Sequence, residues 1–465
     1  MATAGTTQAQ DSQRELILRG HPWRVAWEMS WPAVLAITLF GFNAVLDVVY
    51  IGRLLGERAL AGAVMAYPLT QITLGLGSLA GIGGGVALSI ALGRGDSSTL
   101  KRLPGTALTI TALLALLYAL VGAGFAESLV YGMGARDELI PIAASYLRAS
   151  ALGGIGALAG LTLNMLLRGE GRMKLAALYM GIGLVVNMIL TPLLIIVGDM
   201  GVAGAAWATN IGTAVGGWLV WRRYARGQSS YQVDPYFIGL PRELTRRIVR
   251  LGAPAMIMSS MGVIQAVVVF NVLSRIGTES DIAFYGAAWR IVIFMITPLF
   301  GLMRAFQPVA GFNYGAGQWQ RVQTCFWTFV QAGALIIVPL WLIMAAFPAQ
   351  TLGIMLPGVS FSPQDLLHFR LLILPLPLLP LVFTALALLP AVEQPGKATI
   401  ISVSRQLLLY IPVMLILPPL IGVSGVYLGA MGIELVCSAW LLLTVLYVFR
   451  RAPAAASAVP AKARG

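Results

Sequence analysis

Asp47 lies in an otherwise apolar stretch, where its carboxyl group could bind a proton or a cation. The stretch is FNAVLDVVY at 42–50, and the i−4 neighbour of Asp47, Asn43, is polar but uncharged. An acid near the centre of a membrane helix costs roughly 2.5–3.5 kcal/mol on insertion. A proton or a bound cation neutralises such a carboxylate. We therefore predict a coupling-ion site at Asp47, and a structural pair with an arginine of another helix is the alternative.

Glu434 is a second acid inside an apolar run, MGIEL at 431–435. It could serve the second half of the chain as Asp47 serves the first, or it could simply bond a neighbouring helix. Arg290 could be a counter-charge in a C-lobe site with Glu434, or it could extend from a helix end toward the interface. We expect Arg304, near a helix end, to extend its charged group toward the interface. Arg405 is expected to bond interior carbonyl groups.

Polar and aromatic side chains fall within other apolar stretches. Asn187 and Thr191 are four residues apart, so they share one helix face, and Thr209 lies on the next stretch. Such residues also bond between helices without any further role. A cavity rich in aromatic residues would bind flat cations. The candidates for its lining are Tyr67, Trp207, Trp289 and Gln265.

The sequence offers little support for catalysis or bound metal. His21 and His368 stand alone without metal-ligand spacing, and Cys325 and Cys437 lie far apart in apolar stretches. The three glycines at 83–85 lack the Lys-Ser or Lys-Thr of a nucleotide-binding loop. We therefore expect no enzyme, no cofactor and no disulfide framework, and energy either from an ion gradient or from no source.

Composition places these residues in a membrane. The chain has 465 residues, of which 58% are hydrophobic and 11% charged, whereas soluble domains carry about 25% charged residues. Twelve stretches are long enough to cross a bilayer. They run roughly over 27–50, 59–92, 103–126, 139–167, 173–197, 202–221, 251–276, 282–306, 325–347, 366–392, 398–420 and 426–449. In the overlong second stretch, we expect 81–95 to be a glycine-rich exit rather than straight helix.

Basic residues predict the orientation of these stretches. The net charge of +13 would suggest nucleic acid in a soluble protein, but cytoplasmic loops of membrane proteins also collect Lys and Arg. With the N-terminus inside, 22 of the 31 Lys and Arg residues fall on the cytoplasmic side and four outside. We therefore predict a multi-pass membrane protein with both termini cytoplasmic and no nucleic-acid partner. Because residues 1–20 are polar and no short apolar core with a cleavage site follows, we expect no cleaved signal peptide.

The two halves of the chain repeat each other. Pro32 matches Pro254 and Arg53 matches Arg275, each 222 residues later, and Gly93 matches Gly315 at the same offset. Six helices per repeat make the repeats parallel, related by a pseudo-twofold axis along the membrane normal, as in transporters whose halves rock against each other. The predicted segments are a tail at 1–22, an N-lobe at 23–221, a basic linker at 222–250, a C-lobe at 251–450 and a tail at 451–465.

Several motifs resemble those of multidrug and toxic compound extrusion (MATE) transporters. The stretch DVVYIGRLLG at 47–56, with ALAG at 59–62, is similar to the family's first-helix signature. So are FQP at 306–308 with GFNYGAG at 311–317, RGEG at 168–171, GVAGAA at 201–206 and EQP at 393–395. The likeness extends over 24–450 and is closest to prokaryotic branches with an acid in the N-lobe, which implies a location in the inner (plasma) membrane of a prokaryotic cell.

The resemblance implies a V-shaped, all-α membrane protein that exports small amphiphilic cations in exchange for H⁺ or Na⁺, as a monomer in the lipid bilayer. By position, Asp47 looks like the coupling acid, with Asn187 and Thr209 as polar neighbours. The family's usual Asn-x-x-x-Asp-Pro is here NMILTP at 187–192, with Thr191 in place of the acid. Hard cations prefer charged oxygen ligands, so we favour H⁺. A flippase for a lipid-linked saccharide with a similar two-lobe fold is the alternative, and a membrane enzyme or receptor is a weaker one.

Overall fold

The computed structural model describes residues 13–451, without the side chains at 260–263 and 266. The described chain is helical and contains no β-strand. The first half holds α2 (Pro22–Leu55), α3 (Glu57–Thr70), α4 (Ile72–Arg94), α5 (Ser97–Gly124), α6 (Ala126–Gly132), α7 (Leu139–Gly169), α8 (Met173–Pro192), the π-helix η1 (Leu193–Val197) and α9 (Gly201–Ala225).

The second half follows a nonhelical connection at 226–241, which is shorter than the predicted linker because α9 and α10 extend into it. It holds α10 (Arg242–Ile276), α11 (Glu279–Gly315), α12 (Trp319–Ala346), α13 (Pro348–Gly353), α14 (Pro363–Ile373), the 3₁₀-helix η2 (Leu376–Leu378), α15 (Leu379–Ala391), α16 (Pro395–Val403), the π-helix η3 (Ser404–Leu409), α17 (Tyr410–Ile421) and α18 (Ser424–Arg450).

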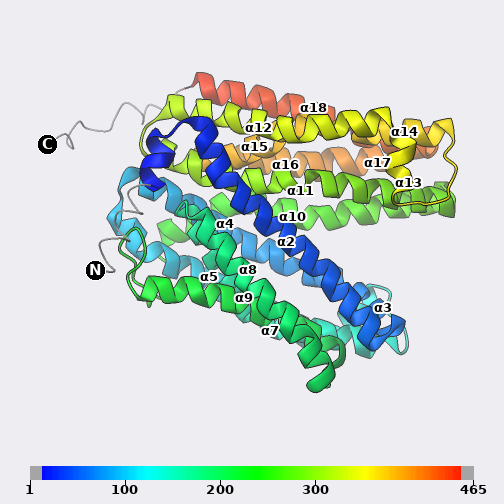
Figure 1. Cartoon of the computed structure of the whole chain (residues 1–465), viewed down its shortest axis with the longest axis horizontal. Helices are drawn as coiled ribbons and strands as arrows, with labels where there is room; N and C mark the ends of the chain where they lie inside the picture. The colour runs from blue at the N-terminus through cyan, green and yellow to red at the C-terminus, as the bar shows by residue number, and fades with distance from the viewer. Residues whose placement is uncertain (1–12, 452–465) are drawn as a thin grey trace.

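These helices make twelve passes, six in each half, and confirm the predicted all-α architecture. Ten spans in the described chain are long and apolar enough to cross a membrane, and α9 and α10 supply the other two passes. We call the end where α2 begins and α18 ends the basic end, because it carries Arg94, Arg172, Arg222 and Arg247. The two lobes lie together at the basic end and diverge toward the opposite, far end (Figure 1).

Helix α4 corrects the expectation of a glycine-rich exit at 81–95. It continues as α-helix to Arg94, and only Gly95, at φ +71°, leaves the helical conformation. Its glycines permit close contact between the lobes. A Cβ on Gly93 would lie 2.9 Å from the Cα of Gly315 on α11, so neither position has room for a side chain. The two glycines are equivalent positions of the repeat, so their contact places the pseudo-twofold axis between α4 and α11.

The first helix of each lobe packs partly on the other lobe. Val25 and Met29, near the start of α2, belong to the hydrophobic core of the C-lobe. Ile248 and Leu251, near the start of α10, belong to the core of the N-lobe. Farther along, α2 packs against α8, and α10 against α16 and α17. The starts of α2 and α10 thus pack on the opposite lobes and connect the lobes at the basic end. The far half of each helix packs within its own lobe.

Part of the predicted N-terminal tail is helical and packs against both lobes. Residues 13–19 form a helical segment, and Ile17 is fully buried. Gln13 Nε2 donates to the Gly171 carbonyl of the N-lobe at 2.7 Å, and Arg321 Nε of α12 donates to the Ile17 carbonyl at 3.0 Å. The segment therefore bridges the two lobes. Residues 1–12 of the predicted N-terminal tail, and the C-terminal tail beyond Arg451, lie outside the described residues.

Candidate functional site

Asp47 lies in the far half of α2, where this helix packs against α8 and α9. Among the described residues, it has no ion pair with Arg or Lys. Its polar neighbours are two threonine hydroxyls. Thr209 Oγ1 of α9 lies 3.3 Å from Oδ2, and Thr191 Oγ1 of α8 lies 3.5 Å from Oδ1. Both distances are long for a hydrogen bond between two oxygens.

Each of these hydroxyls also faces a carbonyl of its own helix. Thr191 Oγ1 lies 2.9 Å from the Asn187 carbonyl, and Thr209 Oγ1 lies 3.1 Å from the Ala205 carbonyl. A hydroxyl has one proton to donate, so each threonine donates either to its helix or to Asp47. A protonated carboxyl would instead donate to a hydroxyl oxygen. The two protonation states of Asp47 thus require different hydrogen-bond arrangements on α8 and α9.

Asn187 and Asn43 complete this polar cluster. Asn187 Nδ2 donates to Thr209 Oγ1 at 2.9 Å, while its Oδ1 is buried without a hydrogen-bond partner. Asn43 is 5% exposed, and its Oδ1 also lacks a partner. The structure therefore brings Asn187, Thr191 and Thr209 to Asp47, and it places Asn43 one turn away on the same helix.

Two tyrosines lie close enough to Asp47 for an electrostatic interaction with its carboxyl group. Tyr67 of α3 was a predicted cavity residue, whereas Tyr146 of α7 was missed as a site residue. In the sequence Tyr146 stands out only as one position of the internal repeat. Its proximity to Asp47 depends on how α7 packs against α3, and the spacing of residues along the chain does not reveal that.

The C-lobe acid has a structural partner. Arg405 in η3 donates to Glu434 Oε1 of α18 through Nε at 3.1 Å and through Nη2. Glu434 therefore bonds a neighbouring helix, which was one of its two predicted roles. Arg405 bonds this carboxylate rather than the interior carbonyls that we expected. Arg290, the other predicted member of a C-lobe site, is exposed on α11. The structure shows no contact between Arg290 and Glu434.

The four predicted cavity residues lie on four different helices. Tyr67 is on α3, Trp207 on α9, Gln265 on α10 and Trp289 on α11. Tyr67 is 49% exposed, and Trp289 stacks on Tyr285 with ring planes 6° apart. The two cavities described for the chain lie between the lobes, and none of the four lines either of them. Their role as a lining stays a prediction.

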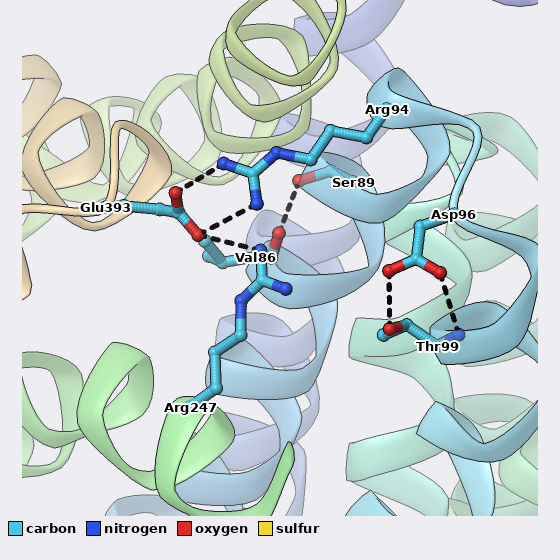
Figure 2. A network of polar contacts seen from close by, with 7 residues as sticks. All are labelled: Val86, Ser89, Arg94, Asp96, Thr99, Arg247 and Glu393. Atoms are coloured by element: carbon cyan, nitrogen blue, oxygen red, sulfur yellow. Dashed lines mark hydrogen bonds and ion pairs between the residues drawn. The ribbon is translucent and has the colours of Figure 1, made fainter. Parts of the chain in front are cut away.

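At the basic end an ion-pair network joins the lobes (Figure 2). Glu393, between α15 and α16, accepts hydrogen bonds from Arg94 of α4 and from Arg247 Nη2 of α10, the latter at 2.8 Å. Arg94 belongs to the N-lobe and Glu393 to the C-lobe. Nearby, Asp96 caps α5 by accepting bonds from Thr99, and these bonds lower its pKa. At this end the ion pair between Arg94 and Glu393 thus crosses from one lobe to the other.

Glu170 is the N-lobe counterpart of Glu393 in the repeat, but it is buried within its own lobe. It is 5% exposed, and neither carboxyl oxygen has a well-formed hydrogen bond. Arg172 Nε lies 3.5 Å from Oε2. Burial raises the pKa of Glu170 to about 7, and the charges of Arg172 and Arg223 lower it only in part. Glu170 is therefore a buried carboxyl group that titrates near neutral pH.

Two six-helix lobes that meet at one end and hold an unpaired carboxyl between membrane helices define the class of secondary membrane transporters. A sequence model of the MatE family matches residues 32–193 and 254–416, one match in each half. The chain belongs to this family, that of the MATE transporters. It is a multi-pass membrane transporter rather than an enzyme.

Relatives and solved structures agree with this assignment. The chain is 24% identical over 446 residues to the multidrug export protein MepA of Staphylococcus aureus strain MSSA476, covering 95% of this chain and 97% of the relative. It is 23% identical to MepA of Staphylococcus saprophyticus over 441 residues, with the same two coverages.

Solved MATE structures share the fold. A MATE structure in the bent conformation has a TM-score of 0.88 at 21% identity, covering 96% of this chain and 99% of that one. A structure of a MATE family transporter in its outward-facing conformation has a TM-score of 0.84 at 22% identity, covering 94% and 98%. These similarities establish the fold that carries the Asp47 cluster.

Proposed function

We propose that this transporter exports small amphiphilic, mostly cationic compounds of varied structure in exchange for protons, by alternating access. Membership of the MATE family and similarity to proteins named for multidrug export support the substrate class. The observation that carries the coupling is Asp47, a carboxyl group between membrane helices with two threonine hydroxyls and no basic partner among the described residues.

The cluster suggests how a proton could act on the lobe. An ionised Asp47 draws the hydroxyl protons of Thr191 and Thr209 and can attract a cationic substrate. A proton arriving from the far end cancels the charge, returns both hydroxyls to their helix carbonyls, and removes the attraction for the cation. The change acts on α8 and α9 beside Pro192, where α8 gives way to the π-helix η1. Release of the proton at the basic end resets the site.

Sodium is the alternative coupling ion. The partnerless Oδ1 atoms of Asn43 and Asn187 are possible oxygen ligands. Asp47 is nevertheless the one carboxylate in the cluster, since Thr191 occupies the position of a second acid. Hard cations favour several charged oxygens, whereas protonation needs one carboxylate. We therefore propose H⁺ as the coupling ion, and the transport assay described below includes a Na⁺ gradient as well.

The proposed orientation places the basic end in the cytoplasm of a prokaryotic cell and embeds the monomer in the inner membrane. Arg94, Arg102, Arg172 and Arg222 lie at this end, as expected for cytoplasmic loops. The lobes meet there and diverge toward the far end (Figure 1), so the structure would be closed to the cytoplasm.

A transport assay in proteoliposomes tests this function. Vesicles with a fluorescent amphiphilic cation are given a pH gradient, a Na⁺ gradient or neither. The pH gradient should drive substrate movement by the wild type, and Asp47→Asn should abolish the acceleration. Asp137→Asn is the matched control, because Asp137 is exposed outside the helices. Equal acceleration by pH in Asp47→Asn, or a response to Na⁺ alone, would overturn proton coupling through Asp47.

The same assay distinguishes the flippase alternative. A lipid-phosphate substrate would need a large surface lined by arginines. Two arginines within helices instead form ion pairs with acids, Arg405 with Glu434 and Arg148 with Glu127. A flippase would move a labelled anionic lipid between leaflets and would leave the cation untransported under every gradient.

A further inference from the structure

Two arginines from opposite lobes line a small cavity near the basic end. Arg168 is in the last turn of α7, in the N-lobe, and Arg304 lies on α11, in the C-lobe. The cavity between them is also lined by Ile82 and Gly85 of α4 and by Gln307 of α11. No acidic side chain lines it.

Both guanidinium groups have unsatisfied hydrogen-bonding capacity. Arg168 is 4% exposed. Its Nε donates to Asn164 Oδ1 at 2.9 Å and its Nη2 to Met180 Sδ at 3.4 Å, but its Nη1 is buried without a partner. Arg304 Nε is also buried without a partner, and no hydrogen bond or ion pair of Arg304 occurs in the part of the chain described. Arg304 lines the cavity between the lobes, whereas the sequence predicted that it extends to the interface.

The two positive charges repel each other. Arginine cannot lose its proton in a protein, and burial of an unpaired charge, as at Arg168, costs several kcal/mol. Arg304 is partly buried. Glu170, two residues after Arg168, does not supply the missing charge, because its carboxyl faces Arg172 and Arg223 instead. A mobile anion would neutralise the pair and accept from the free N–H groups.

The size of the cavity restricts this anion. The volume of the cavity is about 20 Å³. A single water molecule needs about 10–15 Å³. A phosphate group attached to a lipid or nucleotide would not fit. We propose that the cavity binds a single chloride ion between Arg168 and Arg304. Because the arginines belong to different lobes, the ion stabilises the state in which the lobes meet at the basic end.

Thermal unfolding of the purified full-length protein in NaCl and in sodium gluconate, at equal ionic strength, tests the proposal. A ligand that binds only the folded state stabilises it in a saturable way. Chloride should raise the wild-type Tm by roughly 2–4 °C above its value in gluconate, and bromide should substitute for chloride. Arg168→Gln and Arg304→Gln should each abolish the difference between the salts.

The variants also separate an anion site from a merely packed arginine. In gluconate, removing one of two repelling charges should raise the Tm of Arg304→Gln relative to wild type, and in chloride this advantage should disappear. Arg275→Gln, at the exposed end of α10, should keep the full chloride response. A wild-type Tm equal in both salts, or a chloride effect that persists in both cavity variants, would overturn the proposal.

If neither cavity variant folds, binding to the wild type decides the matter. Equilibrium dialysis with radioactive chloride should show one saturable site per chain, displaced by bromide. The absence of saturable binding would contradict the proposal without reference to any variant.

Discussion

At the residue scale, the threonine hydroxyls beside Asp47 are the groups that the proposed mechanism uses to connect protonation with helix geometry. Thr191 and Thr209 each face both a helix carbonyl and the carboxylate, and one hydroxyl proton cannot serve both. An ionised Asp47 competes with α8 and α9 for these protons, and a protonated one does not. In the proposed mechanism, this competition is the step by which protonation changes the lobe.

Thr209→Val tests that step while nearly conserving side-chain shape. A hydrogen bond to a charged group contributes about 1.5–3 kcal/mol, so we expect pH-driven export to slow by roughly tenfold. Thr209→Ser keeps the hydroxyl and should retain most of the rate. The measurement is the initial transport rate in proteoliposomes. Equal rates in Val, Ser and wild-type proteins would show that the hydroxyl does not participate.

Glu170 gives a pH dependence of stability with a defined sign. Its folded-state pKa, about 7, lies above the ordinary value of 4.5, so the folded protein binds more protons than the unfolded chain between these values. The stabilisation from this group is therefore complete below about pH 4.5 and is lost as pH rises through about 7. At higher pH a charged carboxylate stays buried.

Glu170→Gln should remove this dependence. We expect the wild type to lose roughly 1–3 kcal/mol of stability relative to the variant between pH 5 and pH 8. The measurement is Tm as a function of pH for both proteins. Glu138→Gln, at an exposed acid of the far end, serves as the control. Parallel pH curves for wild type and Glu170→Gln would show that Glu170 does not titrate as described.

Sequence reasoning identified Asp47 because a carboxylate in an apolar run is itself informative. It could not identify the partner of Glu434, because Arg405 comes from another helix and only packing brings the two together. The same limit explains why the sequence did not predict the location of Arg304. Its position near a helix end predicts extension to the interface. Its place between the lobes depends on the contact of α11 with α4.

At the element scale, glycines of α4 set the distance between the lobes. In the sequence the run from 81 to 95 resembles a weak helix, because glycine lowers helix propensity. The structure shows the compensating gain, since Gly93 and Gly315 let two helix backbones touch across the lobe interface. The repeat offset of 222 residues relates these glycines in the sequence, but it does not reveal that they meet.

Gly93→Ala should disrupt that contact. The added Cβ would clash with the backbone of α11 at Phe312 and Gly315, and overpacking of this kind costs about 1–3 kcal/mol. Gly286→Ala on α11 is the matched control, because nothing lies within 4 Å of its added Cβ. We expect a lower Tm for Gly93→Ala and an unchanged or slightly higher Tm for Gly286→Ala. The reverse order would contradict the packing role of Gly93.

At the scale of the whole molecule, contacts at the basic end hold the two lobes together. They are the exchanged starts of α2 and α10, the N-terminal segment bonded by Arg321, and the network around Glu393. The apolar contacts provide area, whereas the partly exposed ion pairs each contribute little. The network is therefore suited to break and re-form during a transport cycle.

Glu393→Gln should shift the lobes toward a state open at the basic end. The variant loses the ion pair with Arg94 of the N-lobe and the ion pair with Arg247 at the start of α10. We expect the open fraction to rise several-fold, consistent with a loss of about 1 kcal/mol. Spin labels on α5 and α16 near this end would report the distance distribution. Glu138→Gln breaks an ion pair within the N-lobe and should leave the distribution unchanged. Equal distributions in all three proteins would exclude a closing role for Glu393.

The central claim, exchange of substrate for protons through Asp47, is tested most directly by proton movement itself. Proteoliposomes loaded with an amphiphilic cation and a luminal pH dye, without an imposed ion gradient, are diluted into substrate-free buffer. In the wild type, substrate leaving down its gradient should draw protons in and acidify the lumen. Asp47→Asn should produce no acidification, whereas Asp137→Asn should behave as wild type. Acidification of Asp47→Asn vesicles at the wild-type rate would contradict the account.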